Sequence, residues 1–337
     1  MKIIVDCMSG DNAPLEIVKG AIAGANAHDT DVLLVGDENV IRKIIRENEL
    51  SENRVSIYNT PDDPVLMTDD PGCIIKEKRD SSMGVALRLL AEGKGDAVVS
   101  AGNTGALFTG ATLIVKRIKG MRRAALGAIV PITKPMLIVD SGANIDVLPE
   151  HLLDFALMGS LYMKKVAMVK EPKVGLINNG EEEKKGTELY VKAHQLLKNA
   201  DINFVGNIEG REVPLGVADV IVCDGFTGNI VLKLCEGFGL FLKKTLNQMF
   251  RRNAVTKVGA VFVSESIKSL KKQMDYSEHG GAPFLGISKP VIKAHGSSNA
   301  RSISFCILQA KNYARSGIIN EFYQMAQNKD KYIKSEK

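Results

Sequence analysis

Apolar, β-branched runs that end in a polar, glycine-containing loop and then continue into a helical pattern recur along this chain of 337 residues. The clearest case covers residues 217–236, where Val220, Ile221 and Val222 precede the loop 224–229 and a helix-spaced apolar pattern follows. A buried run of this kind is typical of a parallel strand, and parallel strands are joined by helical crossovers. The repetition predicts an α/β fold with a mostly parallel sheet and helices on both faces.

Five of these loops are expected at one edge of the sheet, because the carboxyl ends of parallel strands meet there. They cover residues 6–12, 100–105, 140–144, 178–186 and 224–229, and they are rich in Gly, Asn, Thr and Asp. A loop that opens a helix presents unpaired N–H groups, which bind an anion or a carbonyl oxygen. Turn and N-cap chemistry is the better explanation of a single loop, so the rest of the chain has to decide between a structural and a functional role.

Several classes of protein lack their usual sequence signals here. No G-x-G-x-x-G follows the first strand, and the chain has no Walker-type P-loop, no H-E-x-x-H, no G-x-S-x-G and no Cys/His cluster with zinc spacing. The absence of Trp and the small number of other aromatic residues disfavour base stacking on nucleic acid. We therefore expect no metal, no cofactor and no nucleic-acid partner.

The amino terminus and the hydropathy pattern predict a cytoplasmic protein. Asp6 falls where a signal peptide has its apolar core, and no apolar run is expected to span a bilayer. The five cysteines show neither metal-like pairing nor an even count for a complete set of disulfides.

The net charge of +5 is unevenly spread. Residues 240–274 carry eight Lys or Arg and one acid in two amphipathic arms, which predicts a projecting helical hairpin over residues 240–275. Its tip is expected to contact an anionic membrane. The predicted contact residues are Met249, Phe250, Val255, Val258 and Phe262. A dimerisation hairpin, or a helix pair packed on the sheet, explains the same pattern.

A second basic segment, KRIKGMRR, covers residues 116–123. A helix C-terminus that complements its own dipole explains it, and so does a surface for an acidic protein partner.

The loops supply neutral hydrogen-bond donors and few nucleophiles, which suits acyl transfer from a thioester to phosphate. Phosphate is itself nucleophilic, and a thiolate with a pKa of about 8.5 leaves readily. The protein then has to bind phosphate, stabilise an oxyanion and align the reactants. Lys185 is the candidate cation, and His295 and Asn229 are candidate donors. Charge balance with the acids at 181–183, a backbone-bonded His and helix capping are the structural alternatives.

Seven motifs, in order, resemble the bacterial phosphate acyltransferases of phospholipid synthesis. They are DSSM at 80–83, SAGNTGAL at 100–107, GAN with PE at 142–150, GEEEKKGTEL at 180–189, DGFTGN at 224–229, GGAPFLG at 280–286 and HGSS at 295–298. The resemblance covers nearly the whole chain. It implies transfer of a long-chain acyl group from acyl carrier protein to inorganic phosphate, and the acyl phosphate would be used by a membrane glycerol-3-phosphate acyltransferase.

The resemblance also implies a fold like that of isocitrate and isopropylmalate dehydrogenases, without their metal or nucleotide. It implies a homodimer attached peripherally to the inner face of the cell membrane. We expect one catalytic α/β unit over residues 1–337, as a single body or as two lobes around one cleft. Lys185, Asn229 and His295 would be catalytic. The implied substrate-binding residues are Asn103, Thr104, Gly105, Asn144, Gly180, Gly186, Asp224, Thr227, Gly228, Gly296 and Ser297.

Two other functions remain open: a short-chain phosphotransacetylase that uses coenzyme A thioesters, and a non-catalytic scaffold at a membrane surface. The chain also departs from the family pattern. Ser9 stands where glycine is usual, and Lys289 stands where a second glycine is expected after Gly286.

Overall fold

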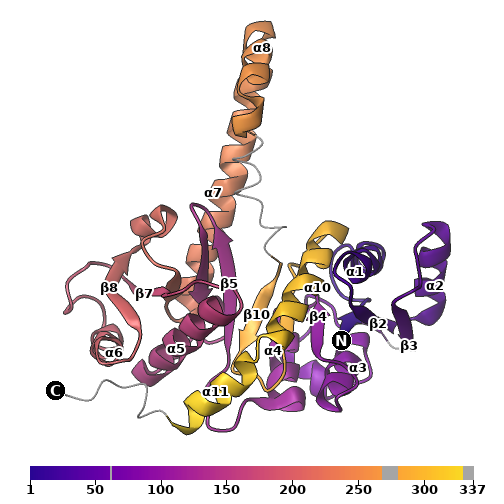
Figure 1. The fold of residues 1–337 in the computed structure, drawn as a ribbon, viewed down its shortest axis with the longest axis horizontal. Helices are drawn as coiled ribbons and strands as arrows, with labels where there is room; N and C mark the ends of the chain where they lie inside the picture. The colour runs from indigo at the N-terminus through magenta and orange to yellow at the C-terminus, as the bar shows by residue number, and fades with distance from the viewer. Residues whose placement is uncertain (61–62, 268–279, 329–337) are drawn as a thin grey trace.

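A computed structural model of the chain describes residues 1–60, 63–267 and 280–328. The strands form one 11-stranded sheet in the order β3-β2-β1-β4-β11-β10-β5-β6-β9-β7-β8, and Figure 1 shows its path through the molecule. The strands are β1 Lys2–Asp6, β2 Asp31–Gly36, β3 Val55–Asn59, β4 Ala97–Ser100, β5 Ala125–Pro131, β6 Pro135–Val139, β7 Lys173–Asn178, β8 Asn203–Glu209, β9 Val220–Val222, β10 Ala282–Leu285 and β11 Val291–Lys293.

The sheet changes direction in its middle. Strands β3, β2, β1, β4 and β11 are parallel to one another, and so are β6, β9, β7 and β8. Between these groups, β10 is antiparallel to both β11 and β5, and β5 is antiparallel to β6. Three antiparallel pairings in a row make the two parallel groups run in opposite directions. The predicted mostly parallel α/β sheet is confirmed.

The prediction that five loops meet at one sheet edge is wrong. The loops after β1 and β4 leave one edge, whereas the loops after β6, β7 and β9 leave the opposite edge. The cause is the β5–β6 hairpin, whose antiparallel pairing around the turn 131–135 reverses the strand direction. β10 is antiparallel to both of its neighbours, so its two reversals cancel. This strand has four residues between glycines, and so short a run has no alternating pattern that would signal antiparallel pairing.

Helices cover both faces of the sheet, as predicted. The helices are α1 Leu15–Ala27, α2 Glu38–Glu47, α3 Ser82–Ala91, α4 Thr104–Gly110, α5 Pro149–Lys165, α6 Glu188–Lys198, α7 Gly225–Arg251, α8 Ala254–Phe262, α10 Ala300–Arg315 and α11 Ile318–Gln327, with short helical segments η1 Pro71–Ile75, η2 Ala111–Lys116 and η3 Gly210–Leu215. Helices α1, α2, α5, α6, α10 and α11 share one continuous buried cluster. On the other face, α3, α4 and η2 bury one cluster and α7 with η3 buries a separate one.

Close packing of α1 on α10 positions the last polar loop of the chain. A Cβ atom on Gly20 would lie 2.4 Å from the carbonyl oxygen of Ala300, so the two helices approach more closely than another residue would allow. The Asn12 side-chain amide donates to the Ser297 carbonyl at 3.0 Å. It therefore does not cap α1, which begins after Pro14 without a side-chain cap.

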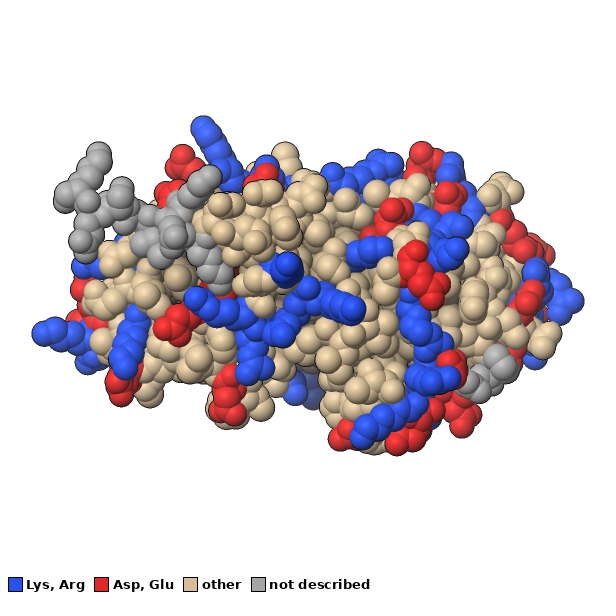
Figure 2. Space-filling model, turned by 90° about the horizontal axis from the view of Figure 1, so that it is seen from below, with Lys and Arg blue, Asp and Glu red and all other residues tan. Residues whose placement is uncertain are grey.

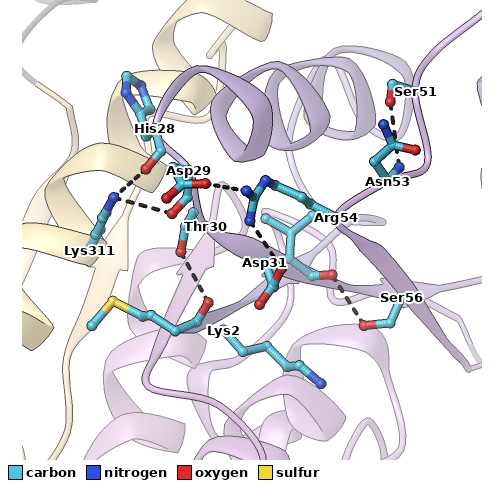
Figure 3. Close-up of polar contacts among 12 residues, drawn as sticks. Lys2, His28, Asp29, Thr30, Asp31, Ser51, Asn53, Arg54, Ser56 and Lys311 are labelled. Carbon is cyan, nitrogen blue, oxygen red and sulfur yellow. Dashed lines mark hydrogen bonds and ion pairs between the residues drawn. The ribbon is translucent and has the colours of Figure 1, made fainter.

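Polar contacts join α10 to the amino-terminal ends of β1 and β2 (Figure 3). Lys311 Nζ donates to the carbonyl oxygens of His28 and Asp29, and Thr30 Oγ1 donates to the Met1 carbonyl at 3.2 Å. The Arg54 guanidinium contacts the Asp29 carboxylate nearby. These contacts hold α10 against the amino-terminal ends of β1 and β2.

Helix α7 starts on the sheet and continues beyond it, and with α8 it forms the projecting arm in Figure 1. Gly225, Gly228 and Cys235 are buried on the sheet, whereas Phe241 and Met249 farther along are exposed. Asn253 caps α8 by accepting from the Thr256 N–H at 2.9 Å. The predicted hairpin runs to residue 275, and its part after residue 267 lies outside the described residues.

By length and composition, α7 passes a test for a helix that could cross a membrane, with a mean hydropathy of 1.2 over 18 residues. This overturns the expectation that no apolar run is long enough. With the first turns held on the sheet, residues 236–251 extend about 24 Å at 1.5 Å per residue. That is less than the roughly 30 Å of a bilayer's hydrocarbon core.

Candidate functional site

Strand polarity divides the predicted site residues into two groups. The first group follows β4 and β11 and consists of Asn103, Thr104, Gly105, His295, Gly296 and Ser297. The second group follows β6, β7 and β9 and consists of Asn144, Gly180, Lys185, Gly186, Asp224, Thr227, Gly228 and Asn229. Within the part of the chain that the structure describes, no hydrogen bond or ion pair joins the two groups.

In the second group, the start of α7 is packed tightly on the loop 140–144. Asp224 caps the helix, because its Oδ1 accepts from the Thr227 N–H at 2.9 Å and its Oδ2 accepts from Thr227 Oγ1 at 2.7 Å. A Cβ atom on Gly228 would lie 1.9 Å from the Asp140 carbonyl oxygen, so this position requires glycine. The packing fixes Asn229, which is partly exposed, beside Gly142.

The loop 140–144 is organised by the buried carboxylate of Asp140. It accepts four backbone N–H groups at 2.6–3.2 Å and the Asn144 side-chain amide at 2.7 Å. Burial raises the pKa of Asp140, and these hydrogen bonds oppose the shift. The same Asn144 amide donates to the Ala124 carbonyl at 2.8 Å, so it holds this loop against the start of β5.

Lys185 lies in the exposed loop before α6, and its side chain is 48% exposed. Its Nζ is 3.8 Å from Glu182 Oε1, which is a loose ion pair. Two glycines shape the loop. A Cβ on Gly180 would lie 2.9 Å from Lys185 Cγ, and Gly186 has a φ of +88°. The ammonium group is therefore accessible to an anion.

Tyr190, near the start of α6, links that helix to the start of α7. The sequence did not identify this residue. Its hydroxyl donates to Asp224 Oδ2, the same oxygen that accepts from Thr227. Burial, followed by the hydrogen bond to this carboxylate, raises the pKa of Tyr190. A tyrosine in the first turns of an amphipathic helix has no sequence signal that distinguishes it from a core residue.

In the first group, Asn103 holds two segments together. Its Oδ1 accepts from the Ala106 N–H at 3.0 Å and caps α4. Its Nδ2 lies 3.0–3.3 Å from three backbone carbonyl oxygens of one acidic loop. These carbonyls belong to Leu66, Met67 and Asp69. The amide is therefore used within the protein, and the partly exposed Thr104 and Gly105 beside it form the first turn of α4.

His295 is exposed at the other side of this group. Its Nδ1 accepts from the Ser297 N–H at 3.2 Å and lies 2.8 Å from Ser297 Oγ. Among the described residues, Nε2 has no hydrogen-bond partner. The Gly296 carbonyl accepts from the Asp11 N–H at 2.8 Å, which joins this loop to the loop after β1.

A buried lysine also lies at this edge, and the sequence did not single it out. Lys293 pairs in register with Ser100, which pairs in turn with Asp6. Its side chain is buried, with Nζ 3.3 Å from the Ala101 carbonyl oxygen. Burial lowers the pKa of Lys293 to about 8.

The two departures from the family pattern have structural explanations. The left-handed turn falls on Gly10, at φ +120°, so Ser9 needs no positive φ. Lys289 donates from Nζ to the Leu90 carbonyl at 2.7 Å.

Of the predicted membrane contacts, four are exposed, with exposed fractions between 56% and 83%, and Phe250 is partly buried. The four are Met249, Val255, Val258 and Phe262.

Several solved structures have a fold similar to that of this chain. The chain is similar to a phosphotransacetylase from Streptococcus pyogenes, with a TM-score of 0.65 and 16% identity over 93% of this chain and 94% of the other. It is also similar to a branched-chain phosphotransacylase from Enterococcus faecalis V583, with a TM-score of 0.55 and 14% identity over 94% and 99% of the two chains. At these identities the likeness shows a shared fold.

Sequence comparison shows the family. A family model described as "Fatty acid synthesis protein" matches residues 1–321. The phosphate acyltransferase of Alkaliphilus oremlandii is 43% identical over 320 residues, which is 95% of each chain. That of Acetivibrio thermocellus is 44% identical over 326 residues, which is 96% of each chain. The seven motifs therefore lie within a match of nearly full length, and this chain belongs to the phosphate acyltransferase family of transferases.

Proposed function

We propose that this protein transfers a long-chain acyl group from acyl carrier protein to inorganic phosphate, and that the acyl phosphate supplies membrane phospholipid synthesis. The observation that carries the proposal is the second group. There an accessible lysine, Lys185, lies in the loop before α6, and a partly exposed amide, Asn229, lies near the start of α7. The Tyr190–Asp224 hydrogen bond joins the start of α6 to the start of α7. A cation and a neutral donor held on a rigid frame suit an anionic nucleophile and a developing oxyanion.

The reaction proceeds in one direct displacement. A phosphate oxygen attacks the thioester carbonyl carbon, a C–O bond forms, and the carbonyl oxygen becomes an oxyanion. The C–S bond then breaks and its electron pair leaves with the carrier's thiolate. Lys185 binds the phosphate, and Asn229 donates to the oxyanion. No enzyme nucleophile is needed, and the buried Cys223, whose pKa is raised by burial, is unsuited to be one.

We also propose a homodimer. The first group, with His295 and the start of α4, lies at the opposite sheet edge from Lys185, so one chain does not bring the two groups together. Helix α7 begins at the second group and exposes an apolar stripe at intervals of four residues, each side chain at least 50% exposed. The stripe consists of Phe226, Ile230, Leu234 and Phe238. A second copy packed on this stripe would cover it.

The projecting arm supports peripheral binding to the anionic inner face of the cell membrane. Val255, Val258 and Phe262 are exposed at its tip, and Arg251 and Arg252 flank them. Apolar insertion beside cations is the pattern of interfacial helices. Such attachment would deliver acyl phosphate to a membrane glycerol-3-phosphate acyltransferase. In this proposal residues 1–337 form one catalytic unit with the hairpin 240–275 as its membrane contact.

The second candidate is a short-chain phosphotransacetylase that uses coenzyme A thioesters, and the shared fold with the Streptococcus pyogenes enzyme favours it. The test compares phosphate-dependent acyl phosphate formation from acyl carrier protein and coenzyme A thioesters of two to sixteen carbons. The proposal expects a preference for long chains on the carrier protein. A preference for acetyl-coenzyme A supports the second candidate, and no product from any thioester supports a membrane scaffold.

A further inference from the structure

A basic surface with two exposed apolar side chains lies beside the second group. We name it the 116–148 surface. It comprises the exposed cations Lys116, Arg117, Lys119, Arg122 and Arg123, together with Ile145 and Leu148, which are 68% and 58% exposed. The segment 116–123 contains no acidic residue. Arg122 is partly neutralised by the buried Asp154, at 3.5 Å, so the segment keeps a strong positive charge.

Contacts at both ends of the loop that carries Ile145 and Leu148 hold these two apolar side chains beside the basic segment 116–123. At one end, the Asn144 amide donates to the carbonyl of Ala124, the residue after Arg123. At the other end, Arg122 donates to the Glu150 carbonyl at 3.4 Å. Cations and apolar groups thus form one continuous surface. The lowered pKa of His151, caused by burial and then by Arg123, agrees with this placement.

This surface adjoins the proposed reaction centre. Asn144, which contacts the basic segment, accepts the Gly225 N–H at 2.7 Å, and Gly225 is the first residue of α7. Gly142 in the same loop faces Asn229. A molecule bound on the 116–148 surface therefore lies one loop away from the amide that we assign to the oxyanion.

The surface also faces away from the projecting arm. In Figure 1 the chain enters β5 at the bottom of the view, whereas α8 projects from the top. Figure 2 views the molecule from below and shows Lys and Arg side chains across the middle of that face. One flat membrane cannot contact both the tip of α8 and this face, so the cations here suit a partner in solution.

We propose that the 116–148 surface docks an acidic carrier protein that delivers the acyl group as a thioester on a flexible arm. The proposal rests on the function proposed above and adds where the donor binds. The cations attract the carrier's negative face and accelerate encounter, and Ile145 and Leu148 bury apolar area once contact is made. The arm then reaches over the loop 140–144 to Asn229.

The test uses the full-length double variant Lys119→Glu/Arg123→Glu, in which both side chains are exposed. The matched control is Lys43→Glu/Arg46→Glu on α2, which makes the same change in net charge beside the outermost strands. Each protein is assayed with palmitoyl carrier protein and with palmitoyl-coenzyme A. Binding of the carrier protein without an acyl group is measured in parallel by titration calorimetry at about 0.05 M and about 0.3 M salt.

We expect the 116–148 variant to raise KM for the carrier donor about tenfold or more and to lose the salt dependence of carrier binding, because charges at the rim of an interface govern encounter. Its activity with palmitoyl-coenzyme A and the control's activity with both donors should stay at the wild-type level. Unchanged carrier binding, or an equal loss with both donors, would overturn the docking proposal. The docking proposal would also be overturned if the Lys119→Glu/Arg123→Glu variant lost binding to anionic vesicles but kept binding to the carrier protein.

Failure of the proposed function is distinguishable from failure of the docking proposal. A wild-type protein that binds the carrier at this surface but forms no acyl phosphate contradicts the function and leaves the surface assignment standing. The variant Ile145→Ser/Leu148→Ser separates the two components of the surface. It should weaken carrier binding by a factor that does not depend on salt, since it removes apolar area and no charge. Unchanged carrier binding by this variant would overturn the proposed role of Ile145 and Leu148.

Discussion

The replacement Gly228→Ala tests whether the docking of α7 on the loop 140–144 determines both stability and activity. A Cβ atom at this position would lie 1.9 Å from the Asp140 carbonyl oxygen, whereas real Cβ contacts essentially never fall below 3.0 Å. The obstacle is backbone and not the end of a flexible side chain. Helix α7 or the loop therefore has to move by about 1 Å, and overpacking of this kind costs about 1–3 kcal/mol.

Gly237→Ala in the same helix is the matched control. No atom lies within 4 Å of a Cβ at Gly237, and the residue is exposed. Alanine there should stabilise the protein by about 0.5–1 kcal/mol, because glycine is unfavourable in a helix. The two variants make the same chemical change, so their difference of about 1–3 kcal/mol in the free energy of unfolding reports the clash and not helix propensity.

Urea unfolding and acyl phosphate formation should be measured for both variants. Because Asn229 follows Gly228 directly, a shift of about 1 Å at the start of α7 should lower turnover about 100-fold. The Gly237→Ala variant should keep wild-type turnover. Equal unfolding midpoints for the two variants, or full activity of Gly228→Ala, would refute the view that this contact positions Asn229.

Four further predictions concern other parts of the molecule. Lys185→Ala should fold normally and lose about 10²–10³ in turnover, as expected for loss of a charge-stabilising donor; near-wild-type acyl phosphate production would contradict its role. Asn103→Ala should lower the free energy of unfolding by about 1–3 kcal/mol, because it removes the α4 cap and the contacts to the acidic loop, and an unchanged urea midpoint would count against it. The pKa of Lys293 is about 8 in the folded protein and 10.5 in the unfolded chain, so the unfolded state binds more protons between these pH values. The free energy of unfolding of the wild type should therefore rise by about 2–3 kcal/mol relative to Lys293→Met from pH 7 to pH 10. A difference in urea titrations that does not change with pH would exclude this. Replacing Val255 and Val258 with Asp should release the protein from anionic liposomes in sedimentation assays, and unchanged sedimentation would argue against membrane contact by the tip.

Sequence patterns were sufficient for most elements that run through a continuous buried segment. β9 occupies the apolar run 220–222 from which it was predicted, and the helix-spaced pattern after it forms α7. The order and direction of strands were not accessible in this way. β10 is a four-residue strand whose antiparallel pairing depends on partners distant in the chain, and the antiparallel β5–β6 pairing reverses the second half of the sheet.

Site prediction had the same limit. The loops and their polar residues were found by motif, but the hydrogen-bond partners of those residues depend on tertiary contacts. Asn103 was chosen as a substrate donor, yet its amide reaches carbonyls more than thirty residues away in sequence. Tyr190 and Lys293 were missed because a tyrosine in a helix and a lysine in a short strand show no pattern until their partners are known.

The most direct test of the central claim is a phosphate-dependent deacylation assay with palmitoyl-acyl carrier protein. The purified protein should release free carrier thiol only when inorganic phosphate is present, and it should form one acyl phosphate for each thiol released. Thiol release that does not depend on phosphate, or release without acyl phosphate, would contradict direct attack of phosphate on the thioester.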